Sequence, residues 1–168
     1  GWISTSAYQD TSQGYFISQG SVIFLPSLNS KSYLNKTTSE IINPENTYKI
    51  VFWVNISKTL EANEYFIFRI KFSNNNELVY LLNGSYSPLS NERKIDITAD
   101  IERNNTWIGI NIVGIEYDYK NQFSESNVPN IIEFSFEYSR ESGNAIIHID
   151  EFLFIRLPID RKSTRLNS

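Results

Sequence analysis

Short segments in which apolar and polar residues alternate are the feature that most constrains the fold of this chain. In residues 48–56 every even position is apolar or aromatic, and the odd positions include Lys49, Trp53 and Asn55. Residues 65–72 alternate in the same way, with Phe or Ile at the even positions. Successive side chains of a β-strand point to opposite faces, so this period of two predicts strands with one buried face.

Further strand candidates follow at regular intervals, divided by clusters of Asn, Ser, Gly and Pro, which is typical of a sandwich. The expected strands are residues 15–25, 48–56, 65–72, 78–82, 95–101, 107–115, 131–138 and 145–155, with a weaker candidate at residues 41–42. Residues 117–129 are expected to form the longest late loop, which is a candidate rim for function. Because the spacing leaves no room for crossover helices, we predict an all-β chain, an antiparallel β-sandwich of the jelly-roll type with about eight strands.

The composition supports this fold class and excludes several functions. The ten Tyr, eleven Phe and three Trp suit a pleated, half-buried surface, and no stretch sustains a 3.6-residue period. A net charge of −4 and a pI near 5.1 argue against nucleic-acid binding, which requires a clustered basic face. No apolar run is long enough for a membrane helix, so no membrane insertion is expected. The absence of Cys excludes disulfides and zinc–thiolate sites.

The expected domain covers residues 1–159, because residues 160–168 differ from it in composition. The body is rich in Asn, Ile and Phe, whereas the last nine residues are basic and polar. One back-translation of this stretch reproduces the start of a widely used sequencing-library adapter, so we interpret it as a non-native tail from adapter read-through. An ordinary basic, disordered tail is the alternative. Under both interpretations, its Arg and Lys residues are not a binding patch.

An ordered set of motifs spans most of the chain. It consists of Gly1-Trp2, Ser18–Gly20 ahead of a strand, Tyr48–Trp53, Thr106-Trp107 and Ile149–Phe152. In this order and spacing the chain resembles the galactose-binding-like jelly rolls, in particular the carbohydrate-binding modules of families 4 and 9. Such modules normally carry an Asn-Gly-x-Phe-Glu segment just before the Gly-Trp, so the resemblance implies a domain truncated at its N-terminus.

The resemblance implies a non-catalytic module that binds a poly- or oligosaccharide by aromatic stacking and hydrogen bonds. It further implies an extracellular or cell-surface location, with a carbohydrate ligand and the other domains of a larger parent protein as partners. The same architecture also serves surface-protein spacers and toxin domains. A structural or protein-interaction jelly roll without a sugar site is therefore the alternative.

Five residues are candidates for the ligand site: Trp53, Arg69, Trp107, Tyr117 and Tyr119. Trp53 lies on the polar face of its strand, and we expect it beside Arg69, where a ring could stack on a sugar and a charged group could bind hydroxyls. Tyr117 and Tyr119 lie in the predicted charged loop and are expected to be exposed. For Trp53 and Trp107 the alternative is burial in the core, which is common for large aromatic side chains.

The resemblance also implies a structural Ca²⁺ ion held by Asp150 of the closing strand. Calcium binds six to eight oxygens, so Asp150 must be joined by other ligands. The available partners are Asp10, Glu133 or residues before Gly1. The alternative is that Asp150 accepts hydrogen bonds at a sheet edge.

We predict that the domain is not an enzyme. His148 is the only His and lies in the middle of an apolar strand, which favours a structural role over that of a general base. Glu133 and Glu137 alternate with apolar residues and are expected on a solvated strand face, not as a glycosidase pair. The sequence contains no Gly-rich phosphate loop and no His cluster with metal-ligand spacing.

Overall fold

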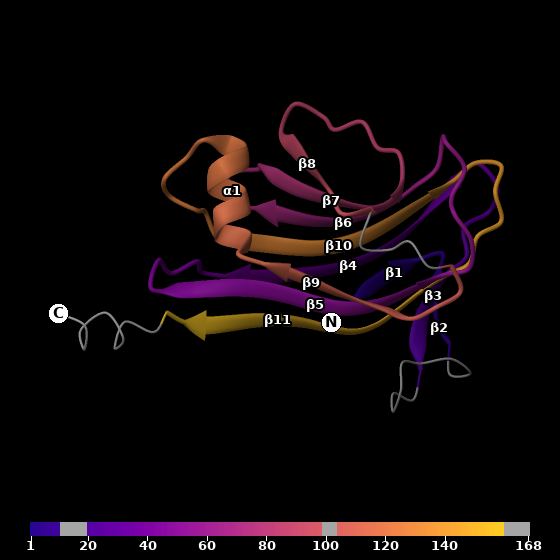
Figure 1. The fold of residues 1–168 in the computed structure, drawn as a ribbon, viewed down its shortest axis with the longest axis horizontal. Coiled ribbons are helices and arrows are strands. Elements are labelled where there is room, and N and C mark those ends of the chain that lie inside the picture. The colour runs from indigo at the N-terminus through magenta and orange to yellow at the C-terminus, as the bar shows by residue number, and fades with distance from the viewer. Residues whose placement is uncertain (11–19, 99–103, 160–168) are drawn as a thin grey trace.

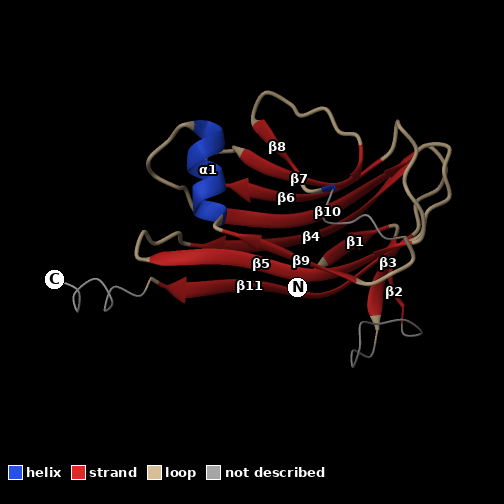
Figure 2. Cartoon of the chain, viewed as in Figure 1, coloured by secondary structure: helices blue, strands red, loops and turns tan. Residues whose placement is uncertain are grey.

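The computed structural model describes residues 1–10, 20–98 and 104–159, which form two β-sheets packed face to face and one short helix (Figure 1, Figure 2). The elements in chain order are β1 (Ile3–Thr5), β2 (Ala7–Asp10), β3 (Ser21–Phe24), β4 (Ser30–Glu40), β5 (Asn46–Ile56), β6 (Tyr65–Phe72), β7 (Glu77–Gly84), β8 (Glu92–Asp96), β9 (Ile108–Val113), α1 (Ile115–Phe123), β10 (Ile131–Arg140) and β11 (Ile147–Pro158). The fold class, an all-β sandwich of the jelly-roll type, is therefore confirmed.

The two sheets differ in size and in their edges. The six-stranded sheet has the order β1-β4-β10-β6-β7-β8, and the five-stranded sheet has the order β2-β3-β11-β5-β9. Neighbouring strands are antiparallel except β7 and β8, which run parallel. The expected number of about eight strands is wrong, because the described residues contain eleven.

The core lies between the sheets and is built from the alternation seen in the sequence. The even positions of β5, from Tyr48 to Ile56, are at most 1% exposed, and the even positions of β6, from Phe66 to Phe72, are fully buried. Phe52 contacts Phe68 and Phe136 across the interface, with ring centroids 5.6 and 5.0 Å apart. Burial of such large apolar side chains is the main source of stability for a sandwich of this kind.

The strands missing from the sequence prediction are polar. No strand was expected at the residues of β4, and among its eleven residues only Ser32 and Leu34 are buried. It is a strand because it pairs along most of its length with β10 and, in part, with β1. A strand defined by backbone pairing, with one buried apolar side chain, carries no alternation for sequence reasoning to detect.

Two predicted strands are described only in part. Of the predicted strand at residues 15–25, residues 15–19 lie outside the described residues, and β3 covers Ser21–Phe24. Residues 99–101 of the predicted strand at 95–101 also lie outside the described residues, and β8 ends at Asp96. The tail at residues 160–168 lies outside them as well.

Helix α1 occupies part of the region that was expected to be a loop. It follows Gly114, whose φ of 76° is a left-handed conformation that favours glycine. The Glu116 carboxylate accepts a hydrogen bond from the backbone N–H of Tyr48 at 2.8 Å, which attaches the helix to β5. With only nine residues, the helix is too short to produce a sustained 3.6-residue pattern. No helix among the described residues is long and apolar enough to span a membrane.

Candidate functional site

The sandwich presents two outer faces, and each gathers aromatic and polar side chains. The outer face of the six-stranded sheet carries what we call the tyrosine face, formed by Tyr33, Tyr65, Arg69, Tyr86, Glu92 and Glu137. The outer face of the five-stranded sheet carries the tryptophan face, formed by Asp10, Trp53, Asn55, Trp107 and His148. Both sheets and the core lie between these faces, so they cannot act as one site.

The centre of the tyrosine face is the guanidinium of Arg69. It donates from Nε and Nη2 to Glu92 at 3.2 and 3.0 Å, from Nη1 to Glu137 at 3.0 Å, and from Nη2 to the Tyr86 hydroxyl at 3.0 Å. The side chains of Glu92 and Glu137 are only 1% and 6% exposed, whereas that of Arg69 is 16% exposed. Two carboxylates from β8 and β10 therefore hold one arginine from β6 in a fixed orientation.

The tyrosines surround this charged centre. Tyr65 donates a short hydrogen bond to Glu137, and Tyr86 donates to Glu92 at 2.8 Å. The rings of Tyr65 and Tyr86 meet edge to face with centroids 4.8 Å apart. Tyr33 lies opposite Glu137 in the register of β4 and β10, on the same face. All three tyrosines are partly buried.

The electrostatics of the face keep these phenols protonated. Burial, together with the hydrogen bond to Glu92, raises the pKa of Tyr86 to about 12. Burial and the neighbouring Glu137 carboxylate also raise the pKa values of Tyr65 and Tyr33. The tyrosines are thus hydrogen-bond donors over the whole physiological range.

One polar atom on this side of the sheet has no partner among the described residues. The Oδ1 atom of Asn35 is buried and accepts no hydrogen bond. Asn35 lies on β4 opposite Ser135, and Ser135 lies opposite Arg69 in the next strand pair. A buried acceptor without a donor costs free energy, and because this atom is closed to solvent it is not counted among the groups that face a ligand.

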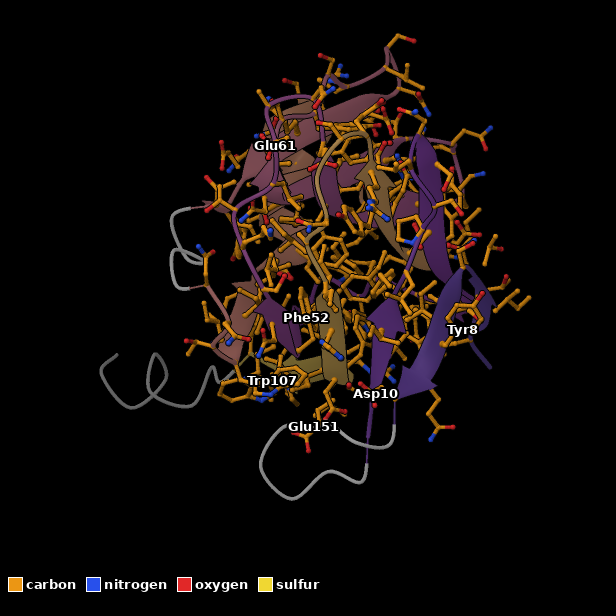
Figure 3. The ribbon with its side chains drawn as sticks, turned by 90° about the vertical axis from the view of Figure 1, so that its right-hand side faces the viewer. Tyr8, Asp10, Phe52, Glu61, Trp107 and Glu151 are labelled. Carbon is orange, nitrogen blue, oxygen red and sulfur yellow. The ribbon has the colours of Figure 1, made fainter. Side chains whose placement is uncertain are left out.

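The tryptophan face is organised around a His–Asp pair. The Nε2 atom of His148 lies 2.9 Å from the Asp10 carboxylate, and its ring lies 6.2 Å from that of Trp107. In Figure 3, Trp107 and Asp10 lie toward the same end of the molecule, with Phe52 in the interior. His148 is 5% exposed, and its partner is the Asp10 carboxylate.

Trp53 lies against the neighbouring strand on the same face. A Cβ atom at Gly109 would lie 3.0 Å from the outer edge of the Trp53 indole, a tight contact, so glycine lets the ring lie close to β9 without a shift. Trp53 and Trp107 are both partly buried, between the exposed and core placements considered from the sequence.

A hollow of about 660 Å³ opens between the two sheets beside β1 and β2. Its lining includes Trp2, Phe136 and Phe152 inside and Asp150 and Glu151 at the bulge of β11. Glu151 has a φ of 55°, and its backbone N–H donates to the Asp150 carboxylate at 2.8 Å. Asp150 therefore accepts a hydrogen bond from the next residue at a bulge of β11, which lies between β3 and β5 and not at a sheet edge.

The described residues contain no group of three or more His, Cys, Asp or Glu side chains that could hold a metal ion. The strand register nevertheless places Asp10 opposite Ser21. Ser21 precedes Val22, and Val22 pairs with Ile149, the residue before Asp150. The Ser21 Oγ atom is buried and has no partner among the described residues. One of the expected calcium partners, Asp10, therefore lies two strands away from Asp150.

The structure does not bring the five predicted ligand residues together. Arg69 was expected beside Trp53, but it lies on the opposite side of the sandwich, because β5 and β6 belong to different sheets. Trp53 and Trp107 do share one face. Tyr117 is 58% exposed on α1, at the end of the sheet remote from Trp107.

Tyr119 was expected to be exposed and is fully buried. Its ring packs on Phe72 with centroids 4.5 Å apart, and its hydroxyl accepts hydrogen bonds from Asn74 and Asn76 and donates to Glu125. It lies on the inner side of α1, which the loop prediction could not anticipate.

Glu137 was expected on a solvated face and is instead 4% exposed. The sequence showed only that it points away from the core. Its carboxylate binds the side chains of Arg69 and Tyr65, which limit its contact with solvent. Sequence reasoning also missed Tyr33 and Glu92. The one available signal was that Tyr33 and Asn35 are two positions apart and so share a face of any strand formed there.

Solved structures with the same fold are mostly carbohydrate-binding modules. A family 16 module superposes with a TM-score of 0.51 and 11% identity over 89% of this chain and 85% of that one. A family 61 module in complex with β-1,4-galactotriose superposes with a TM-score of 0.53 and 13% identity, over 92% of this chain and 88% of that one. The enzymatically active domain of tailspike protein 4 of bacteriophage CBA120 superposes with a TM-score of 0.51 and 11% identity. The match covers 94% of this chain and 19% of that one.

No protein-family profile and no curated protein matches the sequence. At these identities, the structural likeness shows the fold alone. The fold is that of the β-sandwich carbohydrate-binding modules, and the narrower placement in families 4 or 9 stays a prediction.

Proposed function

We propose that the domain is a non-catalytic carbohydrate-binding module and that its ligand binds on the tyrosine face. The observation that carries this proposal is Arg69, fixed by two buried carboxylates between Tyr33, Tyr65 and Tyr86. Half-buried phenol rings offer apolar surface to the C–H groups of a sugar, and the charged groups between them offer hydrogen bonds to its hydroxyls. The solved family 61 module with bound galactotriose supports a sugar as the ligand class.

Replacement of Tyr33 by Ala is expected to weaken glycan binding by about tenfold, because it removes a stacking surface of the site. Tyr33 forms no part of the Arg69 ion pairs, so the fold should be retained. The measurement is affinity gel electrophoresis against soluble β-1,4-galactan, β-1,4-xylan and mixed-linkage β-glucan, with circular dichroism to confirm folding.

Trp107→Ala serves as the matched variant on the tryptophan face, where Trp107 was a ligand candidate from the sequence. The proposal expects it to bind glycan as the parent does. If Trp107→Ala loses binding and Tyr33→Ala retains it, the site lies on the tryptophan face and the proposed location is wrong. If no glycan retards the parent protein, the alternative function stands, a structural or protein-interaction jelly roll.

The expected Ca²⁺ ion is retained as part of the proposal, with Asp150 as its ligand. The unpartnered Ser21 Oγ atom near Asp150 supports it. Millimolar Ca²⁺ is expected to raise the melting temperature relative to EDTA, because an ion that binds only the folded state stabilises it. The rise should disappear in Asp150→Asn and persist in Glu151→Gln, which neutralises the adjacent exposed carboxylate. Equal melting temperatures with Ca²⁺ and with EDTA would count against the ion.

The biological setting is likewise a proposal. We place the domain outside the cell or at the cell surface, joined to the other domains of a larger protein that it directs to a glycan. The fold it shares with solved carbohydrate-binding modules supports this setting.

A further inference from the structure

The hydrogen-bonding capacity left over on the tyrosine face defines the chemistry of what can bind there. A guanidinium has five N–H donors, and four hydrogen bonds from Arg69 are already made within the protein. One N–H of Nη1 is left for a ligand. The acceptors left are the remaining lone pairs of the Glu137 carboxylate, which already accepts from Arg69 and Tyr65.

The fixed charge of the face is negative at its centre. Arg69 contributes one positive charge, and Glu92 and Glu137 contribute one negative charge each, which leaves a net charge of −1. Both carboxylates are almost fully buried, so water screens them poorly.

Three lysines lie around this centre, and none of them forms an ion pair with Glu92 or Glu137 among the described residues. Lys31 is exposed and lies 5.8 Å above the Tyr65 ring, Lys71 lies directly opposite Glu77 on β7, and Lys94 donates to the carbonyl of Tyr86. Charges on exposed side chains are weakened by water and salt.

We propose that the tyrosine face selects neutral, hydroxyl-rich glycans and rejects glycans that carry carboxylates. A sugar hydroxyl can accept from Arg69 Nη1 and donate its one proton to Glu137, which satisfies both groups. A carboxylate has no proton to donate, and it would approach two buried carboxylates whose arginine is already paired. This inference rests on the proposed function and adds the class of glycan to it.

The test uses one polysaccharide in two forms. Soluble β-1,4-galactan is compared before and after oxidation of its C6 primary hydroxyls to carboxylates, by affinity gel electrophoresis with the full chain. We expect the oxidised polymer to bind at least about tenfold more weakly, as the Coulomb energy of one charge near a poorly screened centre implies. Reduction of the carboxylates back to hydroxyls should restore binding, which excludes chain damage as the cause.

Two further measurements connect the rejection to the charge on this face. Glu137→Gln removes one negative charge and should reduce the difference in affinity between the neutral and the oxidised polymer. Glu151→Gln removes the same charge from the other sheet and should leave this difference unchanged. If Glu137→Gln fails to fold, the parent protein is measured at different salt concentrations instead. Raising the ionic strength from about 0.01 M to about 1 M shortens the Debye length from roughly 30 to 3 Å and should reduce the difference in affinity between the two polymers.

The outcomes separate this inference from the function on which it rests. Equal or tighter binding of the oxidised galactan would overturn the inference and leave carbohydrate binding intact. Failure of every neutral polysaccharide in the panel to bind would overturn the proposed function itself.

Discussion

Replacement of Arg69 by Met is expected to lower the free energy of unfolding by about 3–5 kcal/mol, because it leaves two buried carboxylates without their counter-ion. Glu92 and Glu137 are 2% and 4% exposed, and each has its cationic partner in Arg69. Met retains most of the side-chain volume, so the loss reports on the charge. Chemical denaturation in urea at neutral pH measures the effect, which is a large share of the stability of a domain of this size.

Two variants show whether the unpaired charges are the cause. Lys71→Met changes the same charge on the same face of β6, but next to a partly exposed Glu77, and should cost less than about 1 kcal/mol. The triple variant Arg69→Met, Glu92→Gln, Glu137→Gln removes all three charges and should recover much of the stability. If Arg69→Met is as mild as Lys71→Met, the cluster does not contribute to stability as described.

Replacement of Glu64 by Ala is expected to destabilise the domain by at least about 3 kcal/mol, because three backbone donors lose their acceptor. The fully buried Glu64 carboxylate accepts hydrogen bonds from the N–H groups of Glu61, Glu141 and Gly143 at 2.9, 2.8 and 2.9 Å. Its approach to Gly143 is so close that a Cβ there would lie 2.3 Å from Oε1. One carboxylate thus joins the turn before β6 to the turn between β10 and β11.

The contribution of Glu64 should also depend on pH. Burial raises the pKa of Glu64, but the three backbone donors and nearby Arg140 outweigh it, so the pKa lies below its ordinary value. A carboxyl group whose pKa is lowered by folding stabilises the protein above the unfolded-state pKa of about 4.3, and this stability is lost as the pH falls through the folded-state pKa. The difference in unfolding free energy between the parent and Glu64→Gln should therefore shrink from pH 7 to pH 3.

Glu61→Gln is the matched control for this experiment. Glu61 lies in the same turn, and its side chain is exposed. Its replacement should change stability little at either pH. A pH-independent difference between the parent and Glu64→Gln would contradict the assignment of the stabilisation to the ionised carboxylate.

The candidate site was only partly visible in the sequence. The alternation of β6 placed Arg69 on the side of its strand away from the phenylalanines, and this placement is correct. The alternation does not show which sheet β6 joins. Arg69 was therefore expected beside Trp53 instead of beside Glu92 and Glu137. The partners of Arg69 lie 23 and 68 residues along the chain, in strands whose neighbours are set by sheet order.

By itself, the sequence determined the fold class and the inner faces of the strands, because the period of two in β5 and β6 is a local property of the chain. Only the tertiary structure decided which outward side chains meet. It buried Tyr119 under a helix too short to have a pattern, made a strand of polar β4 through pairing with β10, and enclosed Glu137 beside Arg69. These outcomes depend on contacts between residues distant in sequence, and no local periodicity records them.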